Sequence, residues 1–254
     1  LMSELVKITQ QGSITRLTLN NPKQRNPLSN AMIEALISAF DQPEVQQAGM
    51  VVLTAEGKDF CAGGDINDFR DIIDATAAEQ WEACERFRYM LDRFHSLNPV
   101  VVAVVQGRAL GGGCGLVASC DFAIATADAK FGTPEIKLGA FPMVIVPPLI
   151  QAMGVRRTMY MSTLGEPIDA ATALEYGLVQ KVVASDELES QVASFCEQVA
   201  GLSASALRVG KATIRSCAES SFSGGLEIGM GMRSILFSSP EFKQGIKKFL
   251  SPSS

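Results

Sequence analysis

Two glycine-rich turns have the composition of a site that binds a developing negative charge. The first covers residues 60–65 and contains Gly63 and Gly64, and the second covers residues 107–115. Each follows a short apolar stretch and precedes an expected helix. Glycine lets the backbone approach a ligand closely, and the first N–H groups of a helix are unpaired and lie at its positive end. Two such donors aimed at one point form an oxyanion hole. Tight turns alone account for either motif, but two in one chain favour a shared site.

Glu135 offers a carboxylate for proton transfer. General acid–base catalysis uses such a group, commonly with its proton affinity raised by burial. Glu135 follows Pro134, however, and a glutamate in this position also suits the start of a helix, where negative charge interacts favourably with the helix dipole. Spacing alone leaves both roles open for Glu135.

The second turn also fits a dinucleotide-binding pattern. Gly113, Gly115 and Ala118 match G-x-G-x-x-A after a strand, and Glu135 lies 20 residues beyond Gly115. In that pattern the glycines admit a pyrophosphate and the acid binds a ribose. Here the triple glycine begins two residues earlier, and Glu135 stands behind a proline in a different local context. The nicotinamide-cofactor interpretation is therefore the weaker one.

Other reactive side chains give little support for a metal site or a nucleophilic one. His95 is the only histidine, so a histidine-rich metal site is excluded and we expect no metal. No C-x-x-C pair occurs among the six cysteines, which favours free thiols in a reducing compartment. Cys61 and Cys114 adjoin the glycine turns, where cysteine commonly fills small buried spaces. His95 is expected at the surface.

Composition indicates a globular protein that avoids nucleic acid and membranes. Hydrophobic residues make up 47% and charged residues 19% of the 254 positions. The net charge of −5 disfavours general nucleic-acid binding. No apolar run reaches the ~20 residues that a membrane helix needs, and the start of the sequence lacks the features of a secretory signal. We therefore expect a cytoplasmic location.

Apolar periodicity predicts an α/β domain followed by a helical region. The pattern predicts a hairpin formed by residues 5–9 and 14–19. It predicts further strands at residues 50–54, 99–105 and 122–126. The 99–105 strand is apolar throughout, as in strands buried on both faces. The expected helices cover residues 29–40, 77–95, 112–120, 169–176, 186–200, 204–217 and 240–250. We therefore expect an α/β core over residues 1–195 and a helical region over 196–254.

At these turns the chain resembles the enoyl-CoA hydratase/isomerase (crotonase) family. The matching segments are residues 60–66, 106–114, 120–125, 131–139, 165–168 and 177–179. The resemblance implies a spiral of ββα turns with a C-terminal helical trimerisation region, assembled as a homotrimer or a dimer of trimers. It implies an acyl-CoA substrate, in which coenzyme A is part of the substrate and no separate cofactor is needed.

The resemblance also assigns roles to individual residues. Gly64 and Gly112 would donate their backbone N–H groups to the oxyanion hole, and Glu135 would be the catalytic acid–base group. Asn26, Asp65, Ile66 and Asn67 fall where family members bind the acyl-CoA, together with the two glycines. For Asp65 an alternative is that it caps the following helix.

The chain departs from the hydratases of the family at Gly115. Hydratases typically use two glutamates, and the second would stand at this position. A single glutamate is enough for a 1,3-proton shift, so the pattern resembles an enoyl-CoA isomerase. The alternatives are a hydratase with a substituted second acid, a decarboxylase or thioesterase, and a catalytically weak acyl-CoA-binding protein. Residues 143–148 replace small glycines seen in many hydratases, and would either reshape the acyl pocket or serve as core.

Overall fold

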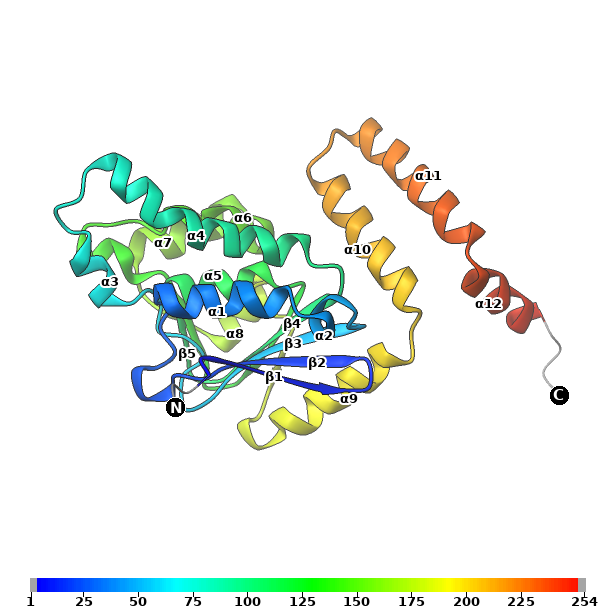
Figure 1. Ribbon diagram of the computed structural model, residues 1–254, viewed down its shortest axis with the longest axis horizontal. Helices are drawn as coiled ribbons and strands as arrows, with labels where there is room; N and C mark the ends of the chain where they lie inside the picture. The colour runs from blue at the N-terminus through cyan, green and yellow to red at the C-terminus, as the bar shows by residue number, and fades with distance from the viewer. Residues whose placement is uncertain (1–3, 251–254) are drawn as a thin grey trace.

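The computed structural model describes residues 4–250 and contains two sheets (Figure 1). Its strands are β1 (Val6–Gln11), β2 (Ile14–Leu19), β3 (Met50–Ala55), β4 (Val100–Val105), β5 (Arg108–Leu110), β6 (Phe122–Thr126), β7 (Lys130–Gly132), β8 (Ile168–Asp169) and β9 (Lys181–Val183). The larger sheet has the order β1-β2-β3-β4-β6-β9, and the smaller has the order β5-β7-β8. The predicted β1–β2 hairpin is antiparallel, and every later pair in the larger sheet is parallel.

Helices cover the larger sheet and form the C-terminal part. They are α1 (Asn30–Phe40), α2 (Pro43–Gln46), α3 (Ile66–Asp71), α4 (Ala77–Ser96), α5 (Gly112–Ser119), α6 (Val146–Met153), α7 (Val155–Leu164), α8 (Ala170–Tyr176), α9 (Leu188–Ala200), α10 (Ala204–Ala218), α11 (Phe222–Ser238) and α12 (Pro240–Leu250). Capping residues in the sequence determine where several of these helices begin. Ser29 caps α1 as predicted, and Thr76 with Glu79 forms a capping box at α4. No helix within residues 4–250 is long and apolar enough to span a membrane.

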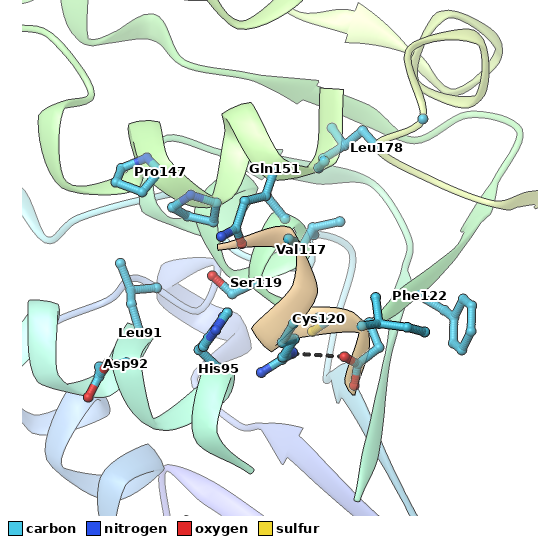
Figure 2. Close-up of a pocket in the computed structure, with 18 of the residues that line it drawn as sticks. Leu91, Asp92, His95, Val117, Ser119, Cys120, Phe122, Pro147, Gln151 and Leu178 are labelled. Carbon is cyan, nitrogen blue, oxygen red and sulfur yellow. Dashed lines mark hydrogen bonds and ion pairs between the residues drawn. The ribbon is translucent and has the colours of Figure 1, made fainter. Parts of the chain in front are cut away.

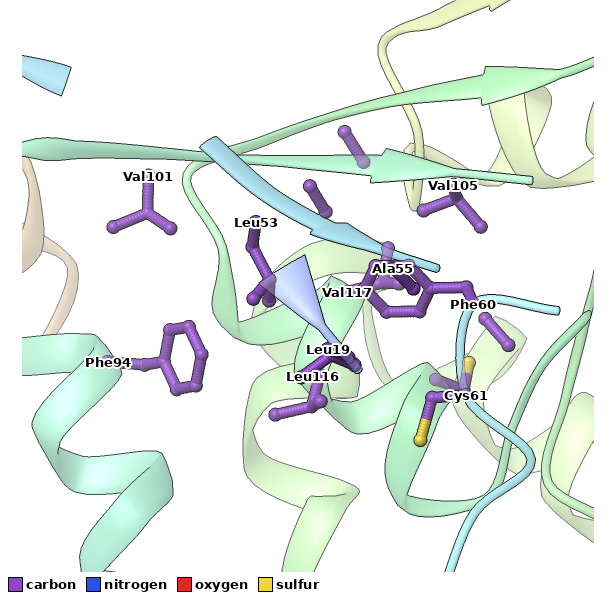
Figure 3. Packing of buried hydrophobic residues seen from close by; sticks show 14 of the residues in the cluster. Leu19, Leu53, Ala55, Phe60, Cys61, Phe94, Val101, Val105, Leu116 and Val117 are labelled. Carbon is purple, nitrogen blue, oxygen red and sulfur yellow. The ribbon is translucent and has the colours of Figure 1, made fainter. Parts of the chain in front are cut away.

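Strand β4 is buried on both faces, as its continuous apolar sequence predicts. Val101, Ala103 and Val105 belong to the larger core cluster, which also includes side chains from α1, α4 and α5. Figure 3 shows part of that packing around Leu53, Phe60 and Leu116. The alternate valines of β4 face a smaller cluster beneath α9. A central parallel strand therefore holds the second glycine turn, which follows it, in a fixed place.

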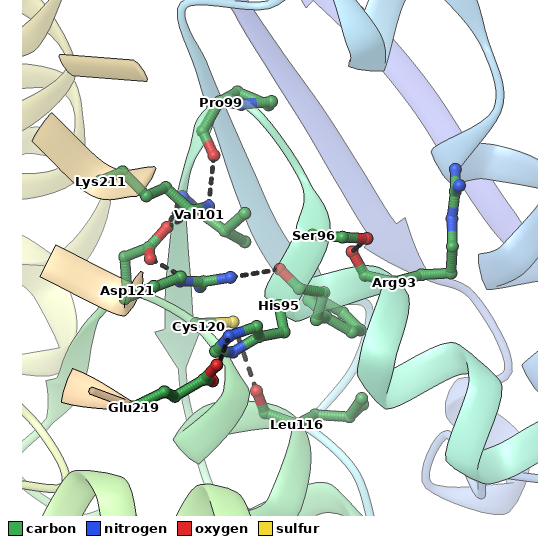
Figure 4. Close-up of polar contacts among 12 residues, drawn as sticks. Arg93, His95, Ser96, Pro99, Val101, Leu116, Cys120, Asp121, Lys211 and Glu219 are labelled. Carbon is green, nitrogen blue, oxygen red and sulfur yellow. Dashed lines mark hydrogen bonds and ion pairs between the residues drawn. The ribbon is translucent and has the colours of Figure 1, made fainter. Parts of the chain in front are cut away.

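The C-terminal helices α10, α11 and α12 extend away from the sheet as an arm (Figure 1). Asp121 joins the arm to the core because it accepts hydrogen bonds from Lys211 at 2.7 Å and Arg215 at 2.8 Å (Figure 4). The predicted boundary between residues 195 and 196 falls inside α9. That helix packs on the sheet through Leu188 and Val192, so it belongs with the core.

Candidate active site

The two glycine turns converge, which their spacing in the sequence could not establish. A Cβ on Gly63 would lie 3.0 Å from the carbonyl oxygen of Leu110, and one on Gly111 would lie 3.6 Å from Cα of Gly63. Both glycines also have positive φ values, 102° and 52°. No other residue fits both the conformation and the contact. The backbones of the two turns therefore meet immediately before Gly64 and Gly112.

A ladder of backbone hydrogen bonds aligns the two turns. The N–H of Phe60 donates to Gln106 at 3.0 Å, and that of Cys61 donates to Arg108 at 3.0 Å. The N–H of Leu110 returns a bond to the carbonyl of Cys61, also at 3.0 Å. The segments leading to Gly64 and Gly112 thus run side by side in a defined register.

The N–H groups of Gly64 and Gly112 are available to a ligand. Gly112 is the first residue of α5, where an N–H has no partner within the helix. Gly64 forms a parallel bridge with Leu28, but Leu28 donates to the carbonyl of Gly63, not to Gly64. Within residues 4–250, neither N–H bonds to a protein acceptor. Both N–H groups are therefore free to donate to a ligand, which is one requirement of an oxyanion hole.

Glu135 lies beside this pair of donors. It stands in the first turn of a 3-10 helix, Pro134–Leu138, and its Oε1 is 2.9 Å from where a Cβ on Gly111 would be. Its Oε2 is buried and has no hydrogen-bond partner among the described residues. Burial raises the pKa of this carboxyl above its usual value. A carboxylate in such surroundings is suited to take up a proton near the oxyanion hole.

The other glycines of the second turn serve close packing. A Cβ on Gly113 would lie 2.5 Å from the carbonyl of Cys61, and one on Gly115 would lie 2.3 Å from Cγ2 of Ile145. Neither position leaves the open space that a pyrophosphate would need. The Glu135 carboxylate lies against Gly111, at the start of the same turn. The dinucleotide alternative therefore has no support in the structure.

The side chain of Ile145 fills the space that a second acid at position 115 would need. It ends a 3-10 helix, Met143–Ile145, is 2% exposed and covers Gly115. Of the two interpretations of residues 143–148, the core role is confirmed for Ile145, and a role in shaping the acyl pocket stays a prediction. Met143, in contrast, is exposed.

Asp65 caps a helix, as the alternative interpretation proposed. It is the N-cap of α3, and its Oδ1 accepts from the backbone and side-chain nitrogens of Asn67, each at 2.9 Å. Ile66 and Asn67 are exposed next to it. No sequence motif predicted the place of Phe69, whose ring covers Gly64 so closely that a Cβ on Gly64 would lie 2.5 Å from Cζ of the ring. The acyl-CoA contacts of residues 65–67 stay a prediction.

Asn26 organises the loop that supports the first turn. It is fully buried, its φ is 52°, and its Oδ1 accepts from the N–H of Asn21 at 2.7 Å. Its Nδ2 donates to the carbonyls of Glu56 at 2.9 Å and Asp59 at 3.0 Å. Both polar atoms of the Asn26 side chain already form hydrogen bonds within the protein. A direct contact between this side chain and the substrate therefore stays a prediction.

A cleft of about 770 Å³ lies at the other end of α5 (Figure 2). It is lined by residues such as Val117, Cys120 and Pro147, and contains neither the two donor glycines nor Glu135. His95 lines it and pairs with Glu219 at 3.1 Å, which agrees with its expected non-catalytic place. A helix C-terminus carries partial negative charge, so this cleft is unsuited to stabilising an oxyanion.

Comparison with known proteins identifies the family. Residues 9–252 match the family model for enoyl-CoA hydratase/isomerase. The chain belongs to this family. A probable enoyl-CoA hydratase of Rhizobium meliloti is 33% identical over 97% of this chain and 95% of its own. The mouse mitochondrial enoyl-CoA hydratase domain-containing protein 3 is 35% identical, over 82% of this chain and 69% of its own.

Solved structures confirm the expected crotonase fold. An enoyl-CoA hydratase of Mycobacterium smegmatis superposes with a TM-score of 0.92 and 30% identity, covering 97% of this chain and 96% of that one. An enoyl-CoA hydratase/isomerase of Marinobacter aquaeolei superposes with a TM-score of 0.90 and 29% identity, covering 97% and 96%. The family is thereby shown, whereas the relatives' names favour hydratases and do not support the isomerase prediction.

Proposed function

We propose that this chain is an enoyl-CoA isomerase that moves a proton along the acyl chain with one carboxylate, Glu135. The observation that supports the proposal is the contact between Ile145 and Gly115, which leaves no room for a second acid at that position. Glu135 meanwhile has a buried, unpartnered oxygen beside the two donor glycines.

The proposed reaction follows from these groups. The thioester carbonyl oxygen of a 3-enoyl-CoA accepts hydrogen bonds from Gly64 and Gly112, and the positive end of α5 favours its growing negative charge. Glu135 removes a proton from C2, which gives a dienolate. The same carboxyl then returns the proton to C4, and the double bond moves to C2–C3. No water enters the reaction, which agrees with the apolar side chain of Ile145 at this end of α5.

The substrate is proposed to be an acyl-CoA held between the first turn and α3. Ile66 and Asn67 lie exposed next to Gly64, and the ring of Phe69 covers that glycine. Coenzyme A enters as part of the substrate, so the proposed reaction needs no other cofactor. We also propose that the chain works as a homotrimer or a pair of trimers.

Product analysis tests the proposal. Purified protein is incubated separately with a 3-enoyl-CoA and a 2-enoyl-CoA, and the products are identified by mass and chromatography. An isomerase converts the first to a product of equal mass and adds no water to the second. Rapid formation of a 3-hydroxyacyl-CoA from the 2-enoyl-CoA, as the hydratase names of the relatives would suggest, would overturn the proposal. Release of free coenzyme A would instead indicate a thioesterase, and a decarboxylase would act on neither compound because neither carries a carboxylate to lose.

A further inference from the structure

An ion pair between a buried carboxylate and a partly exposed guanidinium links the segments that carry the two donor glycines. Asp59 is 4% exposed and precedes the first turn, while Arg108 is the first residue of β5, within the second turn and before Gly112. The guanidinium binds the carboxylate through two parallel bonds, from Nε to Oδ1 at 2.9 Å and from Nη2 to Oδ2 at 2.8 Å. The backbone N–H of Arg108 adds a third bond to Oδ1 at 3.1 Å. This bidentate arrangement, the Asp59–Arg108 fork, fixes the relative orientation of the two side chains as well as their distance.

The ion pair stands where the two segments approach most closely. Gly107 precedes Arg108 and has a φ of 59°, and a Cβ on it would lie 2.0 Å from the carbonyl of Lys58 and 3.0 Å from Oδ1 of Asp59. From this point the backbone ladder runs toward the site. Gly64 lies five residues after Asp59, and Gly112 lies four residues after Arg108. The Asp59–Arg108 ion pair therefore holds the two segments together before the chain reaches Gly64 or Gly112.

The surroundings of Asp59 support this anchoring role. The Arg108 hydrogen bonds lower the pKa of the carboxyl below its usual value, so it stays ionised near neutral pH. Arg25 lies 3.8 Å from Oδ2 on the other side, and its carbonyl accepts from the N–H of Ala62 at 3.0 Å. The early loop, the first turn and the second turn therefore all meet at one carboxylate.

We propose that Asp59, through its fork with Arg108, is a positioning residue that fixes the separation of the N–H donors on Gly64 and Gly112. The inference rests on the proposed function, because it requires that these donors bind a thioester carbonyl. Asp59 itself touches no reacting atom. Its loss would leave acyl-CoA binding largely intact and weaken the two hydrogen bonds that strengthen as the oxygen gains charge.

The test compares Asp59→Asn with a matched variant, Asp121→Asn. Asp121 also accepts one backbone N–H, from Val101 at 2.7 Å, and bonds to two cations, but it lies at the far end of α5. Thermal unfolding measures the loss of stability in each. Turnover is measured with whichever enoyl-CoA the wild type converts. We expect Asp59→Asn to lower kcat at least ~10-fold while KM changes less than about threefold, since small misplacement of a catalytic group is costly.

A spectroscopic measurement reports on the hole directly. The probe is the tightest-binding of butyryl-, octanoyl- and dodecanoyl-CoA, carrying ¹³C at the thioester carbonyl. Two aligned donors polarise this carbonyl and move its resonance downfield on binding. Asp59→Asn should reduce that shift at saturation, and Asp121→Asn should retain it. Arg108→Lys, which keeps the charge but loses the fork, should behave like Asp59→Asn.

The outcomes separate this inference from the proposed function. A wild type that shifts the carbonyl, with Asp59→Asn and Arg108→Lys unchanged in kcat and in shift, would overturn the positioning role alone. A wild type that binds none of the three acyl-CoAs would overturn the proposed function, and the positioning role would fail with it. If Asp59→Asn does not fold, the kcat and shift of Arg108→Lys decide between the same results.

Discussion

Ile145 lies against Gly115 so closely that its Cγ2 methyl is 2.3 Å from the point where a side chain on Gly115 would begin. A glutamate at position 115 alone would therefore be overpacked, which typically costs ~1–3 kcal/mol of stability. The double variant Gly115→Glu/Ile145→Gly removes this steric conflict, because the isoleucine side chain is no longer present. Position 145 tolerates the change, because it is a helix N-cap and glycine is accepted there. Any test of a second acid must change both residues.

We expect the double variant to gain hydration of a 2-enoyl-CoA, since it supplies both a second carboxylate and space for water beside it. The single variant Ile145→Gly is the control, because it opens space without adding an acid. The measurement is the rate of 3-hydroxyacyl-CoA formation. Equal rates for the single and double variants would show that the added carboxylate does not contribute.

Glu135 should make stability and activity depend on pH in opposite directions. Its folded-state pKa is raised above the unfolded value of ~4.3. Its contribution to stability is therefore complete below the unfolded pKa and is lost as pH rises through the folded pKa. Glu135→Gln should thus gain in Tm relative to wild type as pH rises from 4 to 8. A difference in Tm that stays constant over this range would show that Glu135 is not destabilised by burial.

Activity should rise over the same range, because the base must be ionised. The acid limb of kcat/KM for wild type is expected to report a pKa above the ordinary glutamate value. A limb at or below that value would contradict the raised proton affinity of Glu135.

Gly111→Ala should disturb the site in two ways, through backbone strain and through a close contact with Glu135. Its φ of 52° is unfavourable for alanine, and the new Cβ would lie 2.9 Å from Oε1 of Glu135. We expect a loss of turnover of ~10²-fold, the scale of a misplaced catalytic group. Gly12→Ala is the matched control: its φ is 58°, but nothing lies within 4 Å of its added Cβ. Similar thermal destabilisation in both variants, with activity lost only in Gly111→Ala, would separate displacement of Glu135 from backbone strain.

The exposed apolar residues of α11 predict self-association. Leu226 is 61% exposed and Met230 is 67% exposed, one helical turn apart. Apolar patches of this kind are commonly covered by a partner. Light scattering at micromolar concentration should give three or six times the 27.1 kDa chain mass. The double variant Leu226→Glu/Met230→Glu should give a monomer. The control Trp81→Glu, which changes an exposed residue on α4, should keep the assembly of the wild type. A wild-type monomer would contradict the predicted assembly.

Local sequence signals predicted most of the core. The alternation in residues 14–19, the apolar 99–105 strand and the cap at Ser29 are short-range features, and each appears as expected. Asp65 forms the cap that was left open as an alternative. Helix α11 was not delimited, because Gly224, Gly225, Gly229 and Gly231 lower its helix propensity.

The site was predictable only in part, because its remaining features depend on how separate loops and helices pack together. Gly64, Gly112 and Glu135 stand in motifs that can be read along the chain. The packing of Ile145 on Gly115 joins residues 30 positions apart, and the ring of Phe69 covers Gly64 only after α3 has folded back. The Asp59–Arg108 pair spans 49 positions. No local pattern predicts such contacts, since they depend on how the loops meet.

Glu135→Gln tests the central claim most directly. The amide keeps the shape of the carboxyl but cannot take up a proton near neutral pH. The measurement is the isomerisation of a 3-enoyl-CoA at saturation, together with the Kd of an unreactive acyl-CoA. A sole proton shuttle predicts a loss of at least ~10²-fold in turnover, with the Kd nearly unchanged. Turnover within a few-fold of wild type would show that another group carries the proton, and the single-carboxylate account would be wrong.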